Sequence, residues 1–158
     1  MEIRIGNGFD VHKLAPGLPL TLCGVTVPSE KGCVAHSDGD VAIHALCDAL
    51  LGALALGDIG KHFPDTSEKY KGIDSRILLK SVLEMITERG WRIGNIDITL
   101  MLQKPKLAPY IHEMRKMLAS VLDLDLECVS VKATTTEKLG FIGREEGIAT
   151  FASILLFN

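Results

Sequence analysis

The feature that most constrains the fold is a long, almost wholly apolar segment spanning residues 38–56, DGDVAIHALCDALLGALAL. Asp40, His44 and Asp48 interrupt it at a spacing of four residues, which places the three side chains on one face of a helix. A helix that is apolar almost all round is a buried helix. A buried carboxylate or imidazole is costly unless it is paired, hydrogen-bonded or bound to a metal. The segment therefore predicts a core helix with one narrow polar stripe.

The N-terminal segment offers polar side chains that match this stripe. Asp10 and His12 lie two residues apart in a strand-like run, so both point to one face. With His44 they provide one carboxylate and two imidazoles, a zinc ligand set that leaves a fourth position for substrate, and another borderline divalent ion fits the same donors. The alternative is a capped turn at Asp10 and a hydrogen-bonded core histidine at position 44. Asp48, one turn from His44, is expected to fix the tautomer of that imidazole.

Length and composition limit the class of protein. The chain has 158 residues, which suits a single domain, residues 1–158. A net charge of −3 gives no reason to expect nucleic acid or an anionic membrane as a partner. The four cysteines show no metal-binding or disulfide spacing and are expected to be reduced. No secretory signal or membrane-spanning stretch is visible, so a soluble, cytoplasmic protein is expected.

Hydrophobic periodicity predicts an α+β fold: a mixed sheet with helices packed on one face. Ser37 or Asp38 is the expected N-cap of the first helix. Strands are expected over residues 2–9, 20–23, 25–28, 96–102, 128–133 and 148–157, and helices over residues 38–56, 74–90 and 109–122.

Four further segments have the composition of ligand-binding loops. Residues 35–40 (AHSDGD) precede the helix, whose free N–H groups attract anions, although a simple cap explains them equally. Residues 57–67 (GDIGKHFPDTS) read as a substrate loop or as a solvated connection. Residues 102–108 (LQKPKLA) read as a pocket for a planar ligand or as an ordinary loop. Residues 132–138 (KATTTEK) read as a phosphate site with Glu137 on a hard cation, or as a threonine-rich strand end.

Several of these segments belong to a set of motifs that occurs in one order: GFDVH at 8–12, AHSDGDVAIHAL at 35–46, GDIGKHFPDT at 57–66, NIDITL at 95–100 and KATTTEKLGF at 132–141. In this order and spacing the chain resembles the 2-C-methyl-D-erythritol 2,4-cyclodiphosphate synthase family of the non-mevalonate isoprenoid pathway. The resemblance runs from about Ile3 to Leu156.

The resemblance implies a homotrimer with active sites between neighbouring subunits. It implies Zn²⁺, or another divalent ion, at Asp10, His12 and His44. It places a second cation, Mg²⁺ or Mn²⁺, at Glu137. His36 and Thr135 match the residues that stabilise the transition state.

The resemblance also implies contacts with a cytidine diphosphate substrate. These positions are Asp10, His12, His36, Ser37, Asp58, Ile59, Gly60, Phe63, Pro64, Asp65, Thr66, Ser67, Leu102, Gln103, Lys104, Pro105, Lys106, Leu107, Ala108, Thr134, Thr135, Thr136, Glu137, Phe141 and Arg144. Lys104 and Glu145 stand where the family commonly has a small residue and a glycine.

The implied activity is that of a metal-dependent phosphorus–oxygen lyase. It converts 4-diphosphocytidyl-2-C-methyl-D-erythritol 2-phosphate to the cyclic diphosphate and releases CMP. Two other functions fit the same residues. A metal-dependent phosphohydrolase would use the same three ligands to activate a water molecule. A non-catalytic trimer would bind isoprenoid phosphates around a structural metal.

Overall fold

The first strand is the longest element of the computed structural model, which describes residues 1–158. β1 (Ile3–Pro16) pairs antiparallel with β7 (Gly147–Phe157) from Ile3 opposite Phe157 to Lys13 opposite Gly147. The predicted strand over residues 2–9 was therefore too short. The strand continues through Asp10 and His12 because the long partner strand β7 extends the hydrogen-bonded ladder as far as Lys13.

The main sheet has five strands in the order β4-β1-β7-β5-β6. β5 (Arg92–Met101) and β6 (Val129–Thr134) are parallel, and the other neighbours are antiparallel, so the predicted mixed sheet is confirmed. β4 (Lys31–Cys33) was not predicted. The predicted hairpin is present as β2 (Leu20–Leu22) and β3 (Val25–Val27), which pair with each other outside the main sheet.

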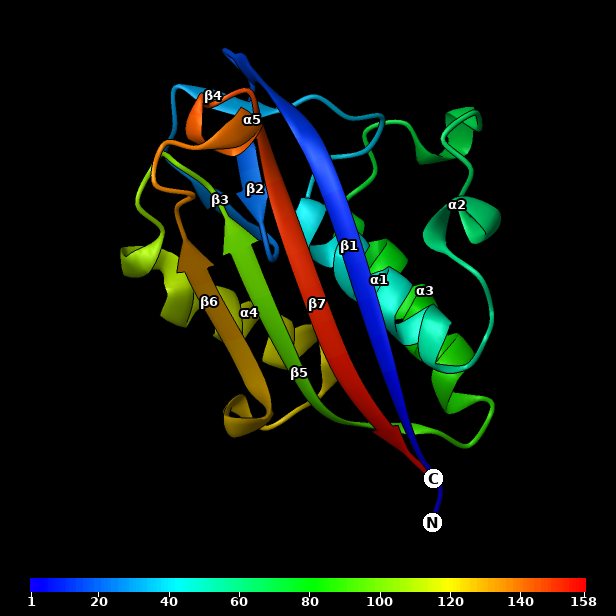
Figure 1. Ribbon diagram of the computed structural model, residues 1–158. Helices are drawn as coiled ribbons and strands as arrows, with labels where there is room; N and C mark the ends of the chain where they lie inside the picture. Colours follow the sequence, from blue (N-terminus) through cyan, green and yellow to red (C-terminus); the bar gives the residue numbers. More distant parts are fainter.

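Three longer helices cover one face of the sheet, as predicted (Figure 1). They are α1 (Val41–Ala53), α3 (Ser75–Thr87) and α4 (Ile111–Leu122). Two segments expected to be loops contain short helices, α2 (Ile59–His62) and α5 (Gly140–Gly143). Single 3₁₀ turns lie at Glu68–Tyr70, Ala108–Tyr110 and Leu126–Cys128.

Helix α1 begins later than the sequence predicts. Neither Ser37 nor Asp38 caps it, because Asp40 accepts a hydrogen bond from the backbone N–H of Ile43 at 3.1 Å and ends the preceding loop. The carboxylate of Asp40 is fully buried. It therefore occupies the start of the helix, where the sequence alone suggested an anion site.

Two glycines let helix α1 lie directly on strand β1. A Cβ atom at Gly8 would lie 1.8 Å from the carbonyl oxygen of Ala45, and one at Gly6 would lie 1.8 Å from that of Ala49. Only glycine permits such a close backbone approach. Since side chains alternate along a strand, the face of β1 that carries these glycines also carries Asp10 and His12. The close packing therefore brings both residues up to the polar stripe of α1.

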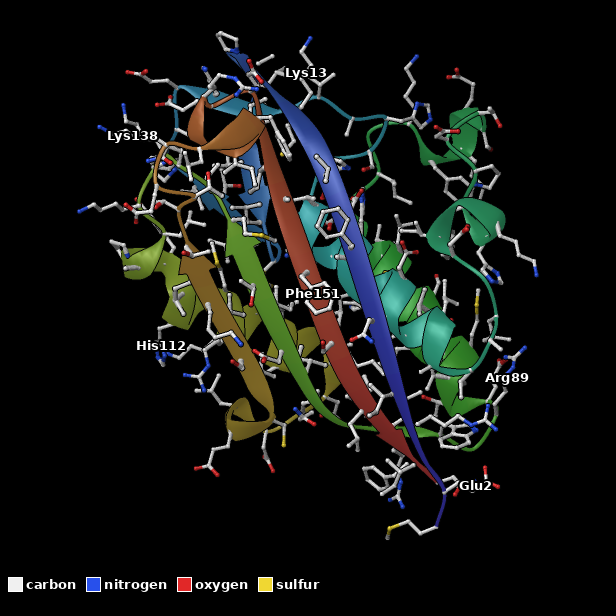
Figure 2. The ribbon with its side chains drawn as sticks, viewed as in Figure 1. Glu2, Lys13, Arg89, His112, Lys138 and Phe151 are labelled. Carbon is white, nitrogen blue, oxygen red and sulfur yellow. The ribbon has the colours of Figure 1, made fainter.

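The opposite face of the sheet carries no helix and displays apolar side chains. Figure 2 shows Phe151 of β7 on this open face. Phe9 pairs with Phe151 across the two strands. The large exposed apolar residues of β1 and β7 are Ile3, Ile5, Phe9, Val11 and Phe151. An apolar patch of this kind on an otherwise folded chain marks a surface that contacts another molecule.

The four cysteines are all free, as the spacing predicted. Three are buried and Cys128 is half-buried, so they pack as small apolar side chains. No helix combines the length and the apolar character that crossing a membrane requires.

Candidate metal and phosphate site

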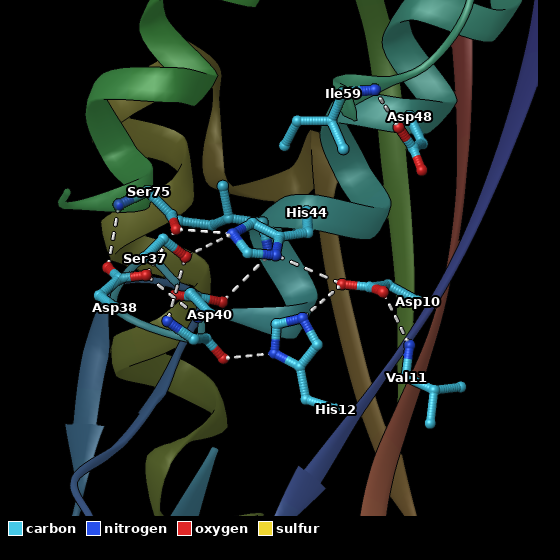
Figure 3. A network of polar contacts seen from close by, with 12 residues as sticks. Asp10, Val11, His12, Ser37, Asp38, Asp40, His44, Asp48, Ile59 and Ser75 are labelled. Carbon is cyan, nitrogen blue, oxygen red and sulfur yellow. Dashed lines mark hydrogen bonds and ion pairs between the residues drawn. The ribbon is translucent and has the colours of Figure 1, made fainter. Parts of the chain in front are cut away.

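Asp10 and His12 of β1 meet His44 of α1 at the junction of strand and helix (Figure 3). The Oδ2 atom of Asp10 lies 3.0 Å from Nε2 of His12 and 3.3 Å from Nδ1 of His44. One oxygen or nitrogen atom from each residue falls within 4.8 Å of the other two. All three side chains are half-buried. The two predicted halves of the metal site are therefore adjacent in the fold.

The ring of His12 is held by its second nitrogen. Nδ1 lies 3.2 Å from the carbonyl oxygen of Gly39. A carbonyl oxygen only accepts hydrogen bonds, so Nδ1 carries the hydrogen. Nε2 then faces Asp10 with a lone pair available to a metal, because a second hydrogen-bonded nitrogen sets the tautomer of a ligating histidine.

The ring of His44 is held in the same manner, but not by the residue that the sequence suggested. Its Nε2 lies 3.0 Å from Oγ of Ser75 and 3.2 Å from Oγ of Ser37, while Nδ1 faces Asp10. Asp48 was expected to orient this imidazole. That expectation was wrong, because its Oδ1 instead accepts the backbone N–H of Ile59 at 2.7 Å and so ties α1 to the start of α2.

Electrostatic interactions within the trio favour a cation. Burial alone would raise the pKa of the Asp10 carboxyl, but hydrogen bonds and charge attraction from His12 and His44 hold that pKa well below its usual range. Burial alone would lower the pKa of His12, but Asp10, with a smaller contribution from the Cys33 thiol, raises it to about 10. In the absence of a metal, the Asp10 carboxylate therefore pairs with a protonated His12. A divalent cation that binds there displaces that proton.

The trio lines a cavity of about 380 Å³ between β1, α1 and the loop that follows α1. This loop carries α2, which stands apart from the sheet in Figure 1. The cavity receives most of the residues predicted for the metal and the phosphate half of the site. Those that line it are Asp10, His12, His36, Ser37, His44, Ile59, Gly60, Phe63 and Asp65.

The other predicted residues of the loop support it without lining the cavity. Asp58 caps α2 by accepting the backbone N–H of Lys61 at 2.9 Å. The carbonyl oxygen of Ser67 lies 3.1 Å from Nε2 of His36, which links the loop to the phosphate half. Pro64 and Thr66 are exposed and lie outside the cavity lining.

A second cavity, of about 220 Å³, lies where β5 and β6 end. It gathers most of the residues predicted for the cytidine pocket, although those residues come from two separate segments. The predicted residues that line it are Leu102, Gln103, Pro105, Lys106, Leu107, Ala108, Thr134 and Thr135.

Five further predicted residues also lie outside both cavities. Lys104 pairs with Glu145 at 3.2 Å, so two of the residues that depart from the family pattern contact each other. The hydroxyl of Thr136 donates to the carbonyl oxygen of Leu139 at 2.7 Å. The side chains of Glu137, Phe141 and Arg144 are exposed.

The two cavities have no residue in common. The first lies beside β1 and the second at the end of β6, and these strands belong to opposite sides of the sheet order (Figure 1). One chain therefore carries two separate cavities.

The sequence missed several residues of the first cavity. Tyr70, Ile73 and Leu78 line it, and Ser75 holds His44 from the start of α3. No local signal marks the three apolar residues, since each fits an ordinary packing pattern. Ser75 lies at the start of the helix predicted over residues 74–90, a position that explains it locally and left its contact with His44 unforeseen.

Comparison with known proteins identifies this architecture. The profile of the YgbB family matches residues 3–157. This chain belongs to the YgbB family. A YgbB-type relative from Shewanella sp. (strain ANA-3), named 2-C-methyl-D-erythritol 2,4-cyclodiphosphate synthase, is 60% identical over 156 residues, which cover 99% of this chain and 98% of the relative.

Solved structures agree with the family assignment. The bifunctional IspDF of Campylobacter jejuni superposes with a TM-score of 0.95 at 51% identity, covering 98% of this chain and 42% of that longer chain. The IspF of Plasmodium falciparum, solved as a CDP complex, superposes with a TM-score of 0.86 at 39% identity, covering 98% of this chain and 96% of the other.

Proposed function

We propose that this chain is a 2-C-methyl-D-erythritol 2,4-cyclodiphosphate synthase. Its substrate is 4-diphosphocytidyl-2-C-methyl-D-erythritol 2-phosphate, and its products are the cyclic diphosphate and CMP. The observation that carries the proposal is the 60% identity to a relative of that name over 99% of this chain. The geometry of the two cavities supports it independently.

The donor set at the first cavity fits a divalent metal. One carboxylate oxygen and two imidazole nitrogens converge, and each imidazole is anchored through its other nitrogen, which is the usual support of a metal-binding histidine. Asp10, His12 and His44 would hold the ion, with zinc as the best match to these donors. Bound there, it would supply Lewis acidity and neutralise phosphate charge.

The reaction needs positioning more than covalent help from the protein. An oxygen of the 2-phosphate forms a bond to the β-phosphorus, the bond from that phosphorus to the bridging oxygen breaks, and the bridging oxygen leaves with CMP. In this reaction His36 and Ser37 would hold the phosphates beside the trio, and Thr135 would contact the phosphate of the departing CMP. Holding both ends of one substrate in near-attack geometry contributes as much as about 7–11 kcal/mol in favourable intramolecular reactions.

Glu137 is proposed to hold the second cation. Its side chain is exposed, and it belongs to no group of converging protein ligands. This fits Mg²⁺ or Mn²⁺, since Mg²⁺ usually takes one or two carboxylates together with substrate phosphate oxygens and water.

A homotrimer would join the two half-sites of neighbouring chains. Three observations support this assembly. The cavities share no residue, and they lie beside β1 and β6, toward opposite ends of the strand order. The open face of the sheet is apolar. Packing of the open faces around a three-fold axis would bury the apolar patch. The same rotation would bring the Thr135 cavity of one subunit to the His44 cavity of the next.

Product identity tests the proposed reaction. We expect ³¹P NMR of purified protein with the substrate, Zn²⁺ and Mg²⁺ to show the cyclic diphosphate and CMP in equal amounts. The reaction should stop when a chelator is added, while the fold is retained. Linear phosphate products would instead identify a phosphohydrolase. Failure of metal-loaded protein to turn over the substrate would favour a binding role.

A further inference from the structure

A chain of hydrogen bonds runs from the His44 imidazole to a carboxylate that takes no part in the metal trio. Nε2 of His44 lies 3.0 Å from Oγ of Ser75, and this Oγ donates to Oδ1 of Asp38 at 2.5 Å. Asp38 also accepts the backbone N–H of Ser75 through Oδ2 at 2.9 Å. Figure 3 shows Ser75 and Asp38 on the side of His44 away from Asp10.

The direction of each hydrogen bond in this chain follows from chemistry. A carboxylate can only accept, so the single hydroxyl hydrogen of Ser75 points to Asp38. Oγ of Ser75 is then an acceptor toward His44, and Nε2 of His44 must carry the hydrogen. This leaves the Nδ1 lone pair of His44 directed at the space beside Asp10.

Burial and further hydrogen bonds fix the positions of Ser75 and Asp38. Ser75 is fully buried, and Asp38 fixes both its backbone and its hydroxyl. The N–H of Asp40 donates to Oδ1 of Asp38 at 3.1 Å, and the N–H of Asp38 donates to the carbonyl oxygen of Ile73 at 3.0 Å. Asp38 is thus held through both its carboxylate and its backbone, where the loop before α1 meets the start of α3.

We propose that Ser75 and Asp38 are positioning residues that hold His44 as an Nε2-protonated ligand with Nδ1 toward the metal. The inference rests on the metal centre proposed above and adds to it the two residues that orient His44. The hydroxyl of Ser37 also reaches Nε2, at 3.2 Å, but it accepts the N–H of Gly39 and has no carboxylate behind it. Ser75 is therefore the directional contact.

The expected consequence is weaker metal binding without loss of the fold. Removing a hydrogen-bond partner of a metal-ligating histidine typically lowers metal affinity by about 10- to 100-fold. We expect Ser75→Ala to lower Zn²⁺ affinity by that factor in a chelator-competition titration. Asp38→Asn, a second variant that keeps the shape of the side chain, should act in the same direction. Because both act through one hydrogen-bond chain, their effects should be clearly less than additive.

Asp74→Ala is the matched control. Asp74 caps the same helix by accepting the N–H of Arg76, but it makes no contact with His44. This variant should bind Zn²⁺ as the wild type does. A loss as large as that in Ser75→Ala would mean that the start of α3 matters only structurally, and would overturn the proposal.

A spectroscopic readout separates positioning from general damage. In Zn²⁺-loaded, ¹⁵N-histidine-labelled wild type, the Nε2–H of His44 should give a solvent-protected imidazole proton signal. That signal should disappear or exchange rapidly in Ser75→Ala. If Ser75→Ala binds Zn²⁺ with wild-type affinity and keeps the Nε2–H signal of His44, the positioning role of Ser75 and Asp38 is overturned and the proposed metal centre is not. Failure of the wild type to bind Zn²⁺ at the trio would overturn both.

Discussion

Replacing His44 by alanine should abolish turnover and leave a folded protein. His44 provides one of three converging donors, and its ring faces a cavity, so its removal opens space beside solvent rather than a void in the core. Loss of a partner that orients a ligand already costs about 10- to 100-fold in metal affinity, and loss of the ligand itself should cost more. Substrate turnover, zinc content and circular dichroism would be measured on one preparation.

His112→Ala is the control for this variant. His112 is exposed on α4 (Figure 2) and lines neither cavity, so its removal should leave turnover and zinc content unchanged. Full activity with unchanged zinc in His44→Ala would remove His44 from the ligand set.

Replacing Asp40 by alanine should destabilise the fold more than any change at the site. The buried carboxylate accepts three backbone N–H groups, from Cys23 at 3.0 Å, Gly24 at 2.6 Å and Ile43 at 3.1 Å. Burial, with a smaller contribution from the charge of Asp38, raises the pKa of Asp40, and the three N–H groups oppose that rise. Leaving these donors without a partner should cost about 3–5 kcal/mol in the free energy of unfolding.

Urea denaturation would measure this loss, with Asp58→Ala as the control. Asp58 also caps a helix, but it is exposed and accepts only the N–H of Lys61, so its removal should cost about 1 kcal/mol or less. A similar loss in the two variants would show that Asp40 acts only as a helix cap and does not hold the β2–β3 hairpin to α1.

The features that the sequence predicted are those set by local periodicity. Alternation along a strand placed Asp10 and His12 on one face, and the four-residue spacing placed His44 and Asp48 on one half-buried polar stripe of an otherwise buried helix. Both patterns depend only on backbone geometry, so tertiary contacts did not alter them. The convergence of the trio also required Gly6 and Gly8, whose importance became visible only when the helix was seen against the strand.

The features that the sequence did not predict depend on contacts between distant segments. Asp40 begins helix α1 because its carboxylate also holds Cys23 and Gly24 of the hairpin, and no local capping rule includes that partner. Ser75 likewise satisfies the pattern of a helix start while its hydroxyl contacts His44 from another helix. The separation of the two cavities follows from strand order, which hydrophobic periodicity does not specify.

Subunit complementation tests the central claim most directly: that each active site joins the metal trio of one chain to the nucleotide cavity of the next. His44→Ala would be co-expressed with a Thr135→Ala/Glu137→Ala chain, each with its own tag, and mixed trimers would be purified through both tags. Either parent alone should be nearly inactive. In every trimer that carries both tags, one of the three sites combines two intact halves, so the purified mixture should regain about a third of wild-type turnover. Mixed trimers as inactive as the two parents would contradict the account.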